Sequence, residues 1–172
     1  MISLVAFSLL AMLQVGDTVR MFPVVEGRNL EGQTLVMPRD FAGDVNVVFV
    51  AFKREQQADV DSWGPTLDTL RARRPGVRVY ELPTLAREYR LMRRFIDGGM
   101  RGGIPDSAVR AATITLYIDK APFKRALGIT SEDHIQVFVV DRGGRIRWQG
   151  SGRYTPALWT KMQEALRTAL ER

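Results

Sequence analysis

The feature that most limits the possible folds of this chain is a nearly continuous apolar run in the first third of the sequence. Residues 45–52 read VNVVFVAF, rich in β-branched and aromatic side chains and interrupted by a single asparagine. A strand with one solvent face alternates apolar and polar residues, whereas a strand covered on both faces does not. The run therefore predicts a central strand of an α/β protein with helices on both sides of the sheet.

Shorter patterns around this run predict the other elements. Turn residues at 27–29, 31–33 and 37–38 surround short apolar pieces, so residues 20–44 are expected to form an N-terminal hairpin. Helices are expected where apolar residues recur every three or four positions. The predicted helices are 59–74 (capped by Asp59), 83–97, 121–127 and 155–170 (capped by Thr155). The predicted strands are 77–82, 112–118, 135–140 and 145–148.

The helix predicted over residues 83–97 has two different faces. Its apolar positions, expected to pack on the core, are Leu85, Tyr89, Met92 and Ile96. Its opposite face is expected to present a stripe of arginines to solvent, formed by Arg87, Arg90 and Arg94. Two glycines at 98–99 are expected to end the helix, and residues 98–103 to form a glycine-rich surface loop.

The order of these elements predicts one α/β domain over residues 15–172. A strand–helix–strand unit is followed by a third strand, a hairpin and a final helix, so a central mixed sheet can be covered on both faces in a three-layer sandwich. The length of 172 residues, with 45% hydrophobic and 26% charged residues, suits one core of this size.

Residues 1–14 are predicted as a separate segment. The apolar run over residues 2–13 has the length of a signal-peptide core and is too short to span a bilayer. No lysine or arginine precedes it, and Leu9 stands two residues before Ala11, the best-placed cleavage residue. Export or membrane association through this segment, and its packing against the core, both stay open.

The chain contains no cysteine and one histidine, His134. This excludes disulfides, thiolate metal sites, iron–sulfur clusters and cysteine-based catalysis. We expect no metal and no cofactor. Glu55, Asp59 and Asp61 could be acid–base groups, but a helix start favours acidic residues without any catalytic role.

Arginine dominates the charge of the chain. The net charge is +6, and residues 71–110 hold ten arginines against four acids. This stretch is expected either to be a solvated face or to bind an acidic protein surface or an anionic lipid. Nucleic acid is disfavoured as a partner, because no recognisable nucleic-acid-binding motif accompanies the charge.

A second group of arginines follows the last predicted turn. Arg145 and Arg147 are expected to share one face of a strand, with Ile146 and Trp148 packed on the other. Arg153 follows two glycines that suggest an unusual backbone turn. Packing does not account for these three arginines, so they are candidate binding residues.

The order of elements, and the hairpin sequence FVVDRGGRIR at 138–147, resemble the redoxin branch of the thioredoxin superfamily. The resemblance implies a thioredoxin-like sandwich with redox cysteines directly after the central strand. Here that stretch is Lys53-Arg54-Glu55-Gln56-Gln57-Ala58, without a thiol, and no proline precedes the hairpin at residues 131–134. The family's disulfide exchange and peroxide reduction are therefore excluded.

Within the superfamily the chain resembles the ATP-ten family of mitochondrial ATP synthase assembly factors. The matching pieces are residues 104–106 (IPD), 123–128 (FKRALG), 137–141 (VFVVD) and 145–152 (RIRWQGSG). The resemblance implies a chaperone-like protein whose partner is a subunit of a membrane complex such as ATP synthase.

These observations lead to two hypotheses about function. In the first, the protein is a non-catalytic binding or assembly protein. Its binding residues are Lys53, Arg54, Gln56 and Gln57, together with the arginine stripe of the helix that begins at Pro83. In the second, it is an enzyme of cysteine-independent chemistry at the same edge, with Gln56, Gln57 or Asp59 acting on a small molecule.

Overall fold

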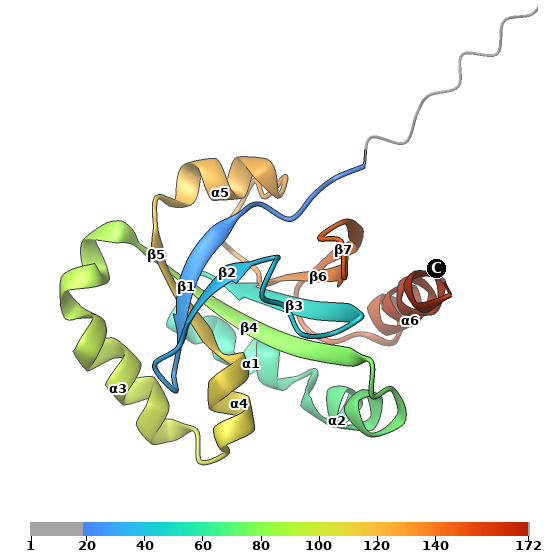
Figure 1. Ribbon diagram of the computed structural model, residues 1–172, viewed down its shortest axis with the longest axis horizontal. Coiled ribbons are helices and arrows are strands. Elements are labelled where there is room, and N and C mark those ends of the chain that lie inside the picture. Colours follow the sequence, from blue (N-terminus) through green and yellow to red (C-terminus); the bar gives the residue numbers. More distant parts are fainter. Residues whose placement is uncertain (1–18, 172) are drawn as a thin grey trace, which may run out of the picture.

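The computed structural model describes residues 19–171, and its centre is a seven-stranded mixed sheet (Figure 1). The strands are β1 (Val25–Asn29), β2 (Thr34–Met37), β3 (Val45–Ala51), β4 (Val77–Ala86), β5 (Ile114–Ile118), β6 (Gln136–Asp141) and β7 (Ile146–Ser151). Their order across the sheet is β2-β1-β5-β4-β3-β6-β7. Every residue of β3 is buried between parallel β4 and antiparallel β6, which confirms the predicted central strand.

Helices cover both faces of the sheet and complete two apolar cores (Figure 1). They are η1 (Arg54–Gln56), α1 (Gln57–Asp61), α2 (Gly64–Arg73), η2 (Arg87–Met92), α3 (Arg93–Gly103), α4 (Ser107–Ala112), α5 (Lys120–Ala126) and α6 (Pro156–Leu170). One core contains Leu67 of α2 and Met162 of α6, and the other contains Phe22 and Phe123 of α5. The three-layer α/β architecture is confirmed.

The elements near the two ends of the described chain also match their predictions. β1 and β2 form the N-terminal hairpin, although residues 27–29 lie in β1 and the turn is made by residues 30–33. β6 and β7 form the second hairpin. The side chain of Thr155 accepts a hydrogen bond from the amide of Leu158 and caps α6, as its position predicts.

The prediction of a helix beginning at Pro83 is wrong. β4 continues to Ala86 because Thr84, Leu85 and Ala86 pair with residues 116–118 of β5. This pairing joins segments about thirty residues apart, so local periodicity does not reveal it. The predicted cap at Asp59 is also wrong, because the helical region starts at η1 and Asp59 lies inside α1.

The expected end of a helix at Gly98-Gly99, and the loop after it, are wrong as well. α3 continues through all four glycines to Gly103. α4 covers residues 107–111, for which the sequence predicts no element, and Ala112, expected to begin a strand. Asp106 caps α4 by accepting a hydrogen bond from the amide of Ala108 at 2.7 Å. Glycine disfavours an α-helix by about 1 kcal/mol relative to alanine but does not prevent it.

A β-bulge changes the expected side-chain pattern of β7. Val139 pairs with Trp148 while its neighbour Val140 pairs with Ile146, so the register shifts at Arg147. Ile146 and Trp148 therefore pack into different cores on opposite faces of the sheet. The expectation that they share one face is wrong, because a bulge places two residues opposite one.

Gly144, in the turn between β6 and β7, has a positive φ of 81°. A Cβ atom there would lie 2.7 Å from Cγ of Pro38, too close for any real contact. We expect Gly144→Ala to lower the free energy of unfolding by about 1–3 kcal/mol, as measured by urea denaturation. Gly143→Ala is the control, since its Cβ atom would meet only a side-chain oxygen at 3.3 Å. An equal loss in both variants would contradict this explanation.

Two properties of residues 19–171 bear on function. None of their helices combines the length and apolar character that a membrane span needs. No group of three or more metal-ligating side chains gathers among them. The segment predicted over residues 1–14 lies outside the described residues.

Candidate functional site

Four of the predicted binding residues lie at the edge of the sheet formed by the carboxyl ends of the central strands, where β3 ends and η1 begins. Gln56 is buried, with 4% of its surface exposed. Its side-chain oxygen accepts hydrogen bonds from the amides of Phe52 and Lys53 at 2.8 and 3.2 Å, and its nitrogen donates to the carbonyl of Glu132 at 2.7 Å. Gln56 therefore joins the end of β3 to the loop before β6, and its polar atoms are occupied by the main chain.

The other three residues, Lys53, Arg54 and Gln57, are exposed. Lys53 forms an ion pair with Asp133 at 3.2 Å. Gln57 donates a hydrogen bond to the carboxylate of Asp61 at 3.0 Å. This edge is an open surface on which charged and amide groups can meet a partner.

Glu132 fixes two further cations beside this edge. Its carboxylate contacts the ammonium groups of Lys120 and Lys124 at 2.6 and 2.9 Å. Burial acts to raise the pKa of Glu132, but the hydrogen bonds and charges of the two lysines outweigh it and hold the pKa below its usual value.

Arg153 reaches the same edge from the far end of the chain. The indole nitrogen of Trp63 donates to the carbonyl of Gly152 at 3.3 Å, and the amide of Tyr154 donates to Ser62 at 2.9 Å. These bonds hold the loop after β7 against α1 and α2. They place the guanidinium of Arg153 3.6 Å from the carboxylate of Asp59. The structure thus brings Arg153 together with the residues of η1 and α1.

A titratable group outside the predicted set of site residues is Glu81, in the middle of β4. Burial raises the pKa of its carboxyl to about 7, the nearby Asp61 adds to this shift, and the Gln57 amide opposes it. The alternation of Val77, Val79 and Glu81 along the strand could have identified it, because it places an acid on a face that otherwise packs against helices.

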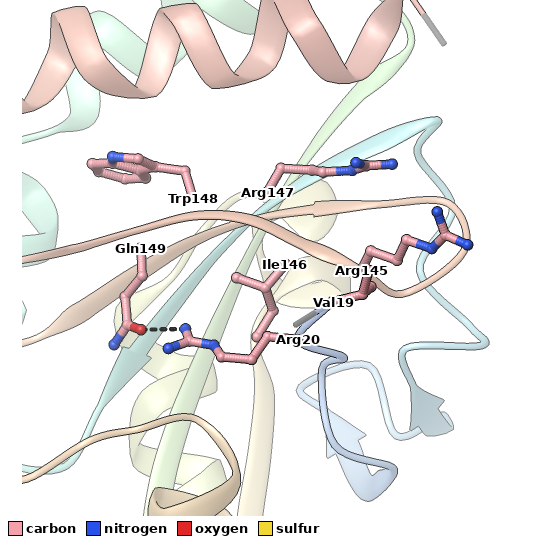
Figure 2. Close-up of a pocket in the computed structure, with 7 residues that line it drawn as sticks. All are labelled: Val19, Arg20, Arg145, Ile146, Arg147, Trp148 and Gln149. Atoms are coloured by element: carbon pink, nitrogen blue, oxygen red, sulfur yellow. Dashed lines mark hydrogen bonds between the residues drawn. The ribbon is translucent and has the colours of Figure 1, made fainter. Parts of the chain in front are cut away.

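Arg145 and Arg147 lie apart from this edge, in a hollow along β7 (Figure 2). The hollow has a volume of about 430 Å³, and Arg20 enters it to donate a hydrogen bond to Gln149 at 2.5 Å. Arg147 is held by Asp141 through contacts of 2.6 and 2.7 Å. A second hollow, of about 620 Å³, lies between Trp148 and α6.

The third group, Arg87, Arg90 and Arg94, lies on η2 and α3 and is exposed as predicted. The apolar residues expected to anchor this helix are not in the core. Leu85 belongs to β4, and no residue of η2 or α3 is buried. Figure 1 places α3 and β7 on opposite sides of the molecule, so the predicted binding residues form three separate groups.

Comparison with known proteins identifies the family of the sequence and the fold of the structure. The sequence model of the family described as ATP10 protein matches residues 16–168. A comparison with curated proteins finds no significant match.

Several solved structures share the fold. A protein from Aquifex aeolicus VF5 assigned to electron transfer has a TM-score of 0.60 at 12% identity, covering 87% of this chain and 96% of its own. BsSco, of the Sco family of cytochrome c oxidase assembly proteins, has a TM-score of 0.56 at 10% identity, covering 90% and 96%. A thiol:disulfide interchange protein of the thioredoxin family from Chlorobium tepidum TLS has a TM-score of 0.53 at 13% identity, covering 88% and 97%. At these identities the similarity shows a thioredoxin-like fold.

Proposed function

Because the chain belongs to the ATP10 protein family, we propose that it is a non-catalytic binding protein that assists the assembly of a membrane complex, and that this complex is ATP synthase. The observation that carries the proposal is the family match over residues 16–168 in a chain without cysteine. A thioredoxin-like fold without a thiol performs no thiol–disulfide chemistry of its own.

The surface that best suits a partner is the edge formed by Lys53, Arg54, Gln57 and Arg153, which we name the η1 edge. These four side chains are exposed, and they come from two segments that the Trp63 and Ser62 hydrogen bonds hold together. Three of them are cationic, but Lys53 is paired with Asp133 and Arg153 with Asp59. An acidic partner surface would therefore meet Arg54 directly and compete with Asp59 and Asp133 for the other two cations. Gln56 is buried beneath this surface, where its hydrogen bonds hold the end of β3 in place, and it does not contact the partner.

Affinity capture from gently solubilised native membranes tests this proposal. We expect the tagged full-length protein to retain membrane-sector subunits of ATP synthase at low salt and to release them at high salt. Arg54→Glu combined with Arg153→Glu should reduce the retained amount by about tenfold or more, because both changes place like charges against an acidic partner.

Arg73→Glu combined with Arg74→Glu, at the end of α2, is the matched control. Both arginines are exposed and lie outside the η1 edge. This variant should retain the subunits normally. Capture without any ATP synthase subunit would contradict the assembly role, and equal loss in both double variants would contradict the η1 edge.

One observation favours an enzymatic alternative at the same edge. Glu81 has a pKa raised by burial to about 7, which suits a general acid or base near neutral pH. Against this, the amide of Gln56 is occupied by the main chain, and Gln57 lies on an exposed surface. Turnover of a small molecule that Glu81→Gln abolishes, without loss of folding, would support the alternative.

A further inference from the structure

An exposed apolar surface covers η2 and the start of α3. It consists of Tyr89, Leu91, Met92 and Phe95, which we name the η2–α3 patch. Leu91 is 97% exposed and Phe95 is 79% exposed, while Tyr89 and Met92 are each 52% exposed. Neighbouring apolar side chains with this exposure usually mark a site of interaction.

Polar contacts, not the patch, attach α3 to the rest of the molecule. Asp97 accepts a hydrogen bond from the Tyr117 hydroxyl at 2.8 Å, and the Arg93 guanidinium lies 5.0 Å from the centre of the same ring. Further along, Arg101 donates to the carbonyl of Leu30 at 3.2 Å. The folded domain therefore holds α3 in place without covering the apolar side chains of the patch.

Cationic groups adjoin the patch. Arg87, Arg90 and Arg94 are exposed, and within residues 19–171 none of the three forms an ion pair with a carboxylate. η2 and α3 together carry five arginines against two acids. Apolar side chains with adjacent arginines complement a surface that offers both hydrocarbon and phosphate.

The shape of this region favours a fluid surface over a folded protein. Figure 1 shows α3 along the outer edge of the molecule, away from α2 and α6. A Cβ atom added at Gly98, Gly99, Gly102 or Gly103 would meet nothing within 4 Å, so the second half of α3 is open. That half offers few side chains that could interlock with a partner protein, whereas a bilayer needs no shape complementarity.

We infer that the η2–α3 patch docks the protein on the surface of an anionic lipid bilayer. Leu91 and Phe95 enter the boundary between headgroups and acyl chains, and Arg87, Arg90 and Arg94 contact lipid phosphates. This docking does not depend on the proposed assembly role, because it requires no protein partner.

Vesicle binding with a local fluorescent reporter tests this inference in the full-length chain. The natural chain has no cysteine, so Met92→Cys carries a single site for an environment-sensitive dye. On vesicles of phosphatidylcholine with about a third phosphatidylglycerol, the dye should shift to the blue, with affinity about tenfold or more above that for phosphatidylcholine alone. The same dye at Gln163→Cys, on the exposed side of α6, should not shift.

Substitutions then separate the apolar and charged contributions in unlabelled protein. Leu91→Ser with Phe95→Ser should weaken binding by about tenfold or more, while Val24→Ser, which removes an 80% exposed apolar residue elsewhere, should not. Arg90→Gln with Arg94→Gln should weaken binding by about tenfold and reduce its salt dependence. Arg73→Gln with Arg74→Gln is the charge-matched control.

An unshifted dye at residue 92 on both vesicle types would overturn the inference. Vesicle binding that survives the Leu91 and Phe95 substitutions unchanged would also overturn it, because another segment would then carry the binding. Neither result would affect the capture of ATP synthase subunits, so the two proposals can fail separately.

Discussion

Glu81→Gln is expected to stabilise the protein by about 1–3 kcal/mol near pH 8 and by less than half as much near pH 5. Burial raises the pKa of Glu81 from 4.5 to about 7, so the folded state binds more protons than the unfolded state between these values. The stability of the natural protein therefore falls as the pH rises through this range. The neutral amide of glutamine removes the free-energy cost of burying a charged carboxylate and keeps the size of the side chain.

Urea denaturation across this pH range measures the effect. Glu55→Gln is the matched control, because Glu55 is an exposed acid on η1 at the same edge of the sheet. It should change the stability little, and equally at both ends of the range. A Glu81→Gln variant that is no more stable than the natural protein near pH 8 would show that solvent reaches this carboxylate.

Gln56→Leu is expected to lower the free energy of unfolding by about 2–4 kcal/mol. Leucine is similar in size but offers neither the acceptor for the amides of Phe52 and Lys53 nor the donor for the carbonyl of Glu132. Each of these main-chain groups would lose its hydrogen-bond partner in a region where Gln56 itself is buried. Thermal or urea unfolding of the purified protein measures the loss.

The adjacent residue provides the comparison. Gln57 is exposed and donates a hydrogen bond to Asp61 within the same helix. Near pH 5, where Glu81 is protonated and the Gln57 amide does not stabilise its charge, Gln57→Leu should change the stability by less than about 0.5 kcal/mol. If the two substitutions cost the same, the hydrogen bonds of Gln56 would not be what stabilises the end of β3.

The elements that the sequence predicts well depend on strong local signals. The continuous apolar run of β3 and the threonine cap of α6 with its regular apolar face are examples. The end of β4 was missed because it depends on pairing with β5, and the chain between them gives no local sign of that contact. Contacts between distant segments override local helix periodicity.

Periodicity also does not show what covers an apolar face. The helical spacing of Tyr89 and Met92 predicts that both pack in the core, yet both are half-exposed. For the candidate site, position after the central strand correctly places Lys53, Arg54 and Gln57 on an exposed edge. It could not show that Gln56 faces inward, or that the loop after β7 brings Arg153 beside Asp59.

The bulge at Arg147 has a consequence for how copies of this protein behave together. An edge strand with free main-chain groups can add a strand from another molecule and start aggregation. At the start of β7 the amide of Ile146 already donates to the carbonyl of Arg20 at 2.8 Å, and the bulge interrupts the regular pattern next to it. The opposite edge, β2, is only four residues long. Both borders of the sheet thus disfavour intermolecular strand pairing, which keeps a chain rich in exposed apolar side chains from polymerising through its sheet.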